Sequence, residues 1–260
     1  SASPLQSRLP AISERSSFED AQAAAEALWN EWNLGEIPAL RLADAIRQKL
    51  GALVLYIDAP SSVSGAACVV PGVNAILINR NEPEGRQNFD LAHECFHLLT
   101  WEQLPPEHSE SNDPEYRGKG RQKRIEQLAD NFAGALLMPW SVLSPRWQAR
   151  GETEINAWLN KTANELLVTS KALMWRLIQL GWMDKAMQKL VRVDKLTANG
   201  RPQQEQRKPP LFAVEFVERL HVALSKGQLS VRRAASLLGF SIGQLEALFR
   251  DYRLPVPFEL

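Results

Sequence analysis

The run from Phe89 to Trp101 constrains this chain more than any other segment, because it places two histidines and a glutamate inside an apolar stretch (FDLAHECFHLLTW). It contains neither glycine nor proline, and its apolar residues follow a pattern typical of a helix that is buried on most sides. Burial of imidazole and carboxylate groups costs free energy unless another group pairs with them. We therefore expect a buried helix whose polar side chains share a partner.

These polar residues are His93, Glu94 and His97, in the arrangement HExxH. Histidines four positions apart lie on one face of a helix, so their imidazoles can bind one ion. The glutamate between them can hold a water molecule near that ion and act as a general base. The arrangement predicts a Zn2+ site with His93 and His97 as ligands and Glu94 as the catalytic residue. The alternative is two histidines on a half-buried helix face without a metal.

A catalytic zinc ion usually has three protein ligands, so a third is expected elsewhere. The segment Arg121–Pro139 (RQKRIEQLADNFAGALLMP) has apolar residues at helical spacing, and its Glu126 is the candidate third metal ligand. The alternative for Glu126 is a solvated residue of the first turn, favoured there by the helix dipole. Asp130 follows one turn later on the same face, where it can accept a hydrogen bond from a ligand histidine and orient the ring.

The other possible ligands are weaker candidates. His108 lies in the polar segment 102–120, which is rich in proline and serine and is expected at the surface. Cys95 is expected to face away from the two histidines, and Cys68 is expected to be a small core residue of a strand. A donor for a tetrahedral oxyanion is also required, and the sequence does not choose among three side chains of the segment: His108, Tyr116 and Arg117.

Together the two helices resemble the ImmA/IrrE family of bacterial and phage metallopeptidases. The resemblance covers about residues 18–182 and is carried by the LAHE run, by EQLADNFA in the second helix and by the LLMP that follows it. Many members have a second glutamate where Leu128 stands, so Glu126 is the only acidic residue left in that turn. The resemblance implies a zinc-dependent endopeptidase that cleaves a helix-turn-helix repressor of the XRE type and relieves repression of a stress or mobile-element regulon.

The residues before the motif suggest an α+β fold. Helices are expected at 18–32 and 37–50, and short β-rich runs follow at 52–58, 64–70 and 74–79. Three strands followed by the HExxH helix match a zincin-like metallopeptidase core, with a small, mostly antiparallel sheet beside the active-site helices. In that plan a strand at the sheet edge can pair with an extended substrate, but the pattern does not identify the strand.

Helical, helix-turn-helix-like segments are expected to follow this core. In the first, residues 151–195, one interpretation is DNA contact through Lys171 and Arg176. The favoured alternative is packing of the helices against the core, because two basic residues are too few for strong phosphate binding. Residues 196–210 are polar and proline-containing and are expected to form a linker.

A C-terminal helical domain is expected at 211–260, again with a helix-turn-helix-like pattern around Gly239. Its second helix is nearly neutral, whereas a helix that enters the major groove normally carries more positive charge. Contact with a protein or dimerisation is therefore favoured over DNA binding, although Arg232 and Arg233 on the first helix keep DNA binding open.

The composition agrees with a cytoplasmic protein that does not bind membranes. The 260 residues have a formal net charge of zero, which argues against nucleic-acid binding driven by electrostatics. Two distant cysteines fit a reducing compartment, and no apolar run is long enough to span a bilayer. Residues 1–17 lack a signal-peptide core and are expected to form a flexible lead before a peptidase domain at 18–150.

Two other function classes are consistent with these patterns. The first is a regulatory binding protein that keeps a zincin fold and sequesters a protein partner or DNA without proteolysis. The second is a metal-dependent hydrolase of a small molecule, with segment 102–120 covering the site.

Overall fold

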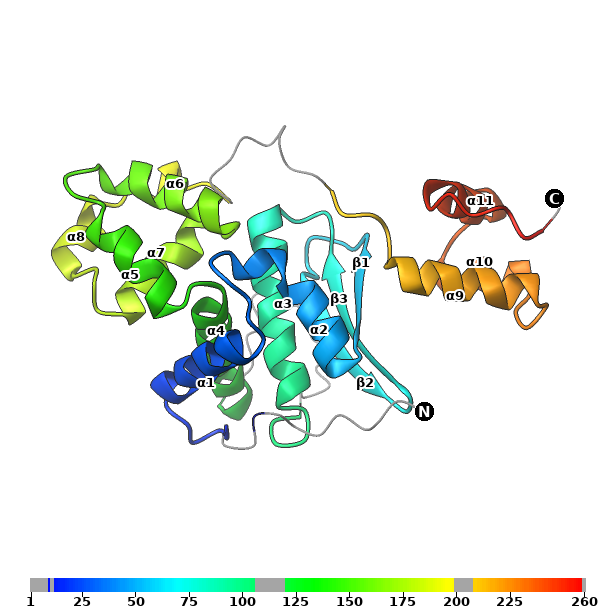
Figure 1. Cartoon of the computed structure of the whole chain (residues 1–260), viewed down its shortest axis with the longest axis horizontal. Coiled ribbons are helices and arrows are strands. Elements are labelled where there is room, and N and C mark those ends of the chain that lie inside the picture. Colours follow the sequence, from blue (N-terminus) through cyan, green and yellow to red (C-terminus); the bar gives the residue numbers. More distant parts are fainter. Residues whose placement is uncertain (1–8, 10–11, 106–119, 199–207, 259–260) are drawn as a thin grey trace.

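A computed structural model describes residues 9, 12–105, 120–198 and 208–258 (Figure 1). The part that leads to the HExxH helix consists of α1 (Phe18–Glu31), the 3-10 helix η1 (Pro38–Leu40), α2 (Leu42–Leu50), β1 (Leu53–Ile57), β2 (Gly65–Val70), β3 (Val73–Asn79) and α3 (Glu84–Leu99). The elements that follow are α4 (Arg121–Leu137), α5 (Trp140–Gln148), α6 (Ile155–Leu166), α7 (Ser170–Gln179), α8 (Lys185–Leu190), the 3-10 helix η2 (Val193–Lys195), α9 (Val214–Ser225), α10 (Val231–Leu238) and α11 (Ile242–Asp251).

The three strands form one sheet with the order β1-β3-β2, and the expected α+β fold class is confirmed. Strands β2 and β3 form an antiparallel hairpin, in which Val70 lies opposite Val73 across a turn whose Gly72 has a φ of +84°. Strand β1 pairs with the other edge of β3 in parallel, with Leu53 opposite Ala75. The sheet is therefore mixed rather than mostly antiparallel, because the chain crosses from β1 to the far side of β3 before it turns back.

Helix α3 packs against β2 and β3 on one side and against α4 on the other. The Phe96 ring of α3 lies 5.4 Å from the Phe132 ring of α4, inside a hydrophobic cluster that continues into α6 and α7. Trp158 and Leu173, from these two helices, are buried members of that cluster. The first helix-turn-helix-like segment thus shares the core of the peptidase part, as the packing alternative predicted.

Arg176 of α7 is only 1% exposed, so the interpretation of this residue as a DNA contact is wrong. Its guanidinium donates hydrogen bonds to the carbonyl of Met138 at 3.1 Å, to Oε1 of Gln22 at 2.7 Å and to Oε1 of Glu26 at 2.7 Å. The same Glu26 oxygen accepts the backbone N–H of Trp140 at the start of α5. Arg176 therefore joins α7 to α1 and to the end of α4 from inside the protein, and Glu26 extends this network to α5.

Helices α9–α11 have their own hydrophobic cluster, centred on buried residues such as Val217 and Phe249. We call residues 208–258 the C-terminal module. Figure 1 shows these helices beyond the β1 edge of the sheet, on the side away from α5–α8. The module is attached to that edge by a hydrogen bond of 2.8 Å from the N–H of Phe212 to the carbonyl of Tyr56 and by an ion pair of 2.9 Å between Lys208 and Asp58.

The segment before α1 is only partly described. Residues 1–8 and 10–11 of the expected flexible lead lie outside the described residues, whereas Ile12 is 3% exposed and belongs to the main hydrophobic cluster. Ser17 caps α1 by accepting the N–H of Asp20. Within the described ranges, every helix is too short or too polar to cross a membrane.

Candidate metal centre

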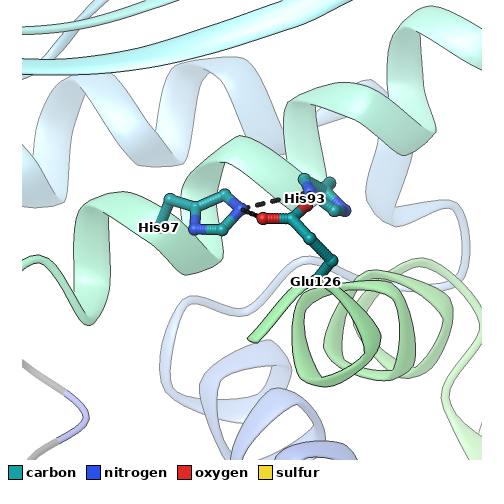
Figure 2. A group of neighbouring side chains, drawn as sticks. All are labelled: His93, His97 and Glu126. Carbon is teal, nitrogen blue, oxygen red and sulfur yellow. Dashed lines mark hydrogen bonds and ion pairs between the residues drawn. The ribbon is translucent and has the colours of Figure 1, made fainter. Parts of the chain in front are cut away.

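Helix α3 brings the two motif histidines into the interior because it is buried along most of its length. The helix begins after Pro83, and ten of its residues are buried, including Leu91, Ala92 and Phe96. On this scaffold His93 and His97 are one turn apart on the face that meets α4 (Figure 2). Their Nε2 atoms lie 3.1 Å from each other, and the ring centroids are 4.9 Å apart.

Glu126 completes the cluster from α4, and its carboxylate points at the two imidazoles in Figure 2. One carboxylate oxygen lies 3.1 Å from Nε2 of His93, and the other lies 3.6 Å from Nε2 of His97. Gln122, one turn earlier on α4, donates a hydrogen bond of 2.6 Å to Oε1 of Glu126. Gln122 was not predicted from the sequence, although its position one turn before Glu126 on the same face is a usable signal.

Asp130 lies behind His93, as expected for a residue that orients a ligand ring. Its Oδ1 atom is 3.1 Å from Nδ1 of His93, the nitrogen on the far side of the ring from Glu126. A proton on Nδ1 can therefore be donated to Asp130, which leaves the Nε2 lone pair of a neutral ring directed into the cluster. His97 has no such partner among the described residues, where its buried Nδ1 is unpaired.

The site is strongly coupled electrostatically. Burial disfavours the charged form of His93, but hydrogen bonds to Asp130 and Glu126 outweigh burial and raise the pKa of this imidazole well above 6.5. For Glu126, burial raises the pKa, but the hydrogen bonds and charges of His93 and His97 lower it far more, so its pKa lies below the ordinary value of 4.5. A buried positive charge at this point is thus compatible with the surrounding carboxylates.

Glu94 projects from α3 toward the sheet and is not part of the ligand cluster. The backbone of β2 passes directly over its side chain, because a β-carbon built on Gly65 would lie 3.2 Å from Cγ of Glu94. The residue is partly exposed, whereas the neighbouring Cys95 is buried on another face of the helix. The structure therefore separates the expected general base from the expected ligands and confirms that Cys95 faces elsewhere.

The three cluster residues fit a divalent metal ion. The ligand atoms of His93, His97 and Glu126 all lie within 4.8 Å of one another. Zinc binds nitrogen and oxygen at about 2.0–2.2 Å in a tetrahedron, which places neighbouring ligand atoms roughly 3.3 Å apart. The observed 3.1 and 3.6 Å separations are close to that value. Two facing imidazole nitrogens with lone pairs repel each other unless a proton or a cation lies between them.

The other described histidine and the two cysteines do not join this cluster. His221 belongs to the C-terminal module, where its Nε2 lies 2.8 Å from the carbonyl of Pro255. Cys68 lies in β2 as a free, partly buried thiol. The candidates for oxyanion stabilisation lie outside the described residues: His108, Tyr116 and Arg117.

A family model supports the assignment suggested by this geometry. The model of the Peptidase M78 family, described as the IrrE N-terminal-like domain, matches residues 47–177 and thus runs from the end of α2 through most of α7, with the whole metal cluster inside it. No curated protein matches the chain. Since the matched region covers half of the 260 residues, the chain belongs to the Peptidase M78 family of metallopeptidases.

Proposed function

We propose that the protein is a zinc-dependent endopeptidase. The observation that carries this proposal is the convergence of Nε2 of His93, Nε2 of His97 and the carboxylate of Glu126 within a space that one ion fills. Two imidazoles and one carboxylate are a donor set of catalytic zinc sites, in which the fourth position is left for water or substrate. When bound, zinc would lower the pKa of a water molecule and polarise a peptide carbonyl.

The chain's own residues divide the remaining work. Glu94 is the proposed general base: it is outside the ligand cluster but close enough for its charge to raise the pKa of His93, and its carboxylate would accept a proton and return it to the departing amine. Asp130 accepts a hydrogen bond from Nδ1 of His93 and so holds the ring with Nε2 toward the cluster. Gln122 donates to Oε1 of Glu126, which fixes the orientation of that carboxylate.

An extended peptide would approach this site along β2. In the described part of the chain, β2 pairs only with β3, so its outer edge offers free backbone groups next to Glu94. The edge of β1 is partly taken by the C-terminal module, since the N–H of Phe212 donates to the carbonyl of Tyr56. Addition of a substrate strand to the β2 edge is therefore the geometry that we propose.

The proposed substrate is an XRE-type helix-turn-helix repressor, whose cleavage would relieve repression of a stress or mobile-element regulon in the cytoplasm. The resemblance of the two site helices to repressor-cleaving metallopeptidases supports this choice. Direct DNA binding is less favoured, because Arg176 is buried and Arg250 on α11 is paired with Glu246. We assign the C-terminal module to contact with a protein, either the substrate or a second copy.

The experiment that tests this function combines metal analysis with repressor cleavage. The wild-type chain is expected to hold about one zinc ion and to cleave a co-expressed XRE-type repressor. His93→Ala should lose both the metal and cleavage, whereas Glu94→Gln should keep the metal and lose cleavage. Absence of metal after reconstitution with zinc would overturn the proposal.

The two variants also separate the proposal from its alternatives. If the wild-type chain holds zinc but leaves the repressor intact, and if the wild type and Glu94→Gln bind the repressor with equal affinity, the protein is a regulatory binding protein. Normal cleavage by Glu94→Gln would show that Glu94 is not the general base.

A further inference from the structure

Strand β2 passes unusually close to the side chain of Glu94. A β-carbon at Gly65 would lie 3.2 Å from Cγ of Glu94, 3.2 Å from Cδ1 of Ile78 and 3.2 Å from the carbonyl oxygen of Leu77. These separations are shorter than ordinary van der Waals contact. The backbone at Gly65 does not have a positive φ, so residues other than glycine can adopt its conformation. What position 65 lacks is space for a side chain.

The register of the sheet explains why this contact falls on the general base. Gly65 is paired with Ile78 of β3, whose side chain is buried on the face that meets α3. Paired residues of neighbouring strands place their side chains on the same face, so the missing side chain of Gly65 would point at α3. The following residues on this face, Ala67 and Val69, carry side chains that pack against the main hydrophobic cluster.

The strand cannot easily move away from Glu94, because the loop before it is fixed by Asn79. This residue is 2% exposed, and its side-chain amide donates hydrogen bonds to the carbonyls of Ala59 at 3.1 Å and Val63 at 2.8 Å. Its backbone N–H donates to the carbonyl of Ser64 at 2.8 Å, directly before Gly65. The start of β2 is thus held in place over α3.

Among the described residues, the carboxylate of Glu94 takes part in no hydrogen bond or ion pair that would fix its direction. A β-carbon at position 65 would therefore press on Cγ of a side chain that no described hydrogen bond holds in place. We infer that Gly65 is a positioning residue, which lets the edge strand cover Glu94 closely and so holds its carboxylate beside the metal cluster. The expected effect of Gly65 on turnover rests on the proposed peptidase function, whereas the close approach of β2 to Glu94 does not.

The contact is tested by a double-mutant cycle on unfolding of the full chain. Gly65→Ala should lower the Tm by about 2–6 °C, since a protein of this size loses roughly 2–4 °C per kcal/mol. In the Glu94→Ala background, which removes Cγ, the same substitution should lower the Tm by clearly less. Ala66→Val adds bulk to the exposed neighbour on the other face of β2 and should leave the Tm nearly unchanged. Equal shifts in both backgrounds would overturn the inference.

The consequence is tested on the repressor that the wild-type chain cleaves. Gly65→Ala should keep its zinc and lose roughly 10²-fold in kcat, because small displacements of a catalytic group cost about that much. In the Glu94→Gln background it should not lower the small residual cleavage any further, whereas a general structural defect would lower it in both backgrounds. Wild-type kcat in Gly65→Ala would overturn the positioning role. A wild-type chain that cleaves nothing would overturn the peptidase function instead, while the unfolding cycle would still decide whether Gly65 constrains Glu94.

Discussion

Oδ1 of Asp130 lies 3.1 Å from Nδ1 of His93, on the side of the ring opposite the metal cluster. The two residues come from different helices, α3 and α4, whose packing therefore sets the direction of the imidazole. The opposite nitrogen, Nε2, faces both His97 and Glu126. A carboxylate behind a ligand histidine fixes its tautomer and increases its basicity.

This relationship predicts a loss of metal affinity when Asp130 is shortened. Asp130→Ala should weaken zinc binding by about 10–100-fold, the range typical for residues that support a ligand histidine. Asp130→Asn keeps an oxygen that can accept the Nδ1 proton, so its loss should be smaller. Competition with a chromogenic chelator measures both affinities. Wild-type affinity in Asp130→Ala would show that packing alone orients His93.

Zinc binding should also release a proton at neutral pH. In the metal-free protein the pKa of His93 lies well above 6.5, since the hydrogen bonds to Asp130 and Glu126 outweigh the effect of burial. These contacts make their full contribution to the free energy of unfolding below pH 6.5, and the contribution is lost as the pH rises through the raised pKa of His93. Because zinc needs the neutral imidazole, its affinity should rise with pH over the same window. Calorimetry in two buffers of different ionisation enthalpy should detect about one released proton per zinc; a buffer-independent enthalpy would contradict this expectation.

The metal site was predictable from sequence because its main parts are local. His93 and His97 are one helical turn apart, so their convergence follows from helix geometry alone. Glu126 and Asp130 share a face of the next helix, and the similarity of that helix to a known family placed it against the first. Gln122 extends the same face by one turn, and this position is the signal by which it could have been predicted.

Other features depend on long-range packing and could not be derived in this way. The close approach of β2 to Glu94 at Gly65 is determined by the register of β2 and by the packing of α3 on the sheet. A short apolar strand does not encode its neighbours, so the parallel pairing of β1 with β3 was missed. Arg176 illustrates the same limit, since a basic residue on a helix indicates an exposed position until its buried partners are known.

The stability of the metal-free protein should depend on Asp90, a buried carboxylate one turn before His93 on α3. Burial raises its pKa from 3.8 to about 6, although Arg86, 3.0 Å away, lowers it. The folded state therefore binds this proton more tightly than the unfolded state, so ionisation costs stability as the pH rises from about 4 to 6. Asp90→Asn should be more stable than the wild type by about 1–3 kcal/mol at pH 7.5.

Urea unfolding at pH 4 and pH 7.5 checks this prediction. The advantage of Asp90→Asn should disappear at the lower pH, where the carboxyl group is neutral in the folded state. An equal advantage at both pH values would mean that the substitution acts through packing and not through charge. Arg86→Gln provides a control of opposite sign, because it removes the cation that lowers the pKa of Asp90.

The two basic residues of α7 should differ sharply in their effects on stability. Arg176→Met leaves the Glu26 carboxylate and the carbonyl of Met138 without their guanidinium partner inside the protein. Loss of one member of a fully buried ion pair typically costs about 3–5 kcal/mol, and because the Glu26 side chain is 33% exposed and can be partly solvated, the cost here should lie toward the lower end of that range. Lys171→Met, at an exposed position of the same helix, should change the free energy of unfolding by less than about 0.5 kcal/mol.

Denaturant unfolding of the two variants tests this difference. Adding Glu26→Gln to Arg176→Met should recover part of the lost stability, because it removes the uncompensated negative charge of Glu26. Small and equal effects of the two single substitutions would contradict the role assigned to Arg176. A large loss of stability in Arg176→Met should also lower any peptidase activity, although Arg176 does not touch the site. The reason is that Arg176 joins α7 to α1 and to the end of α4, and α4 carries Glu126 and Asp130.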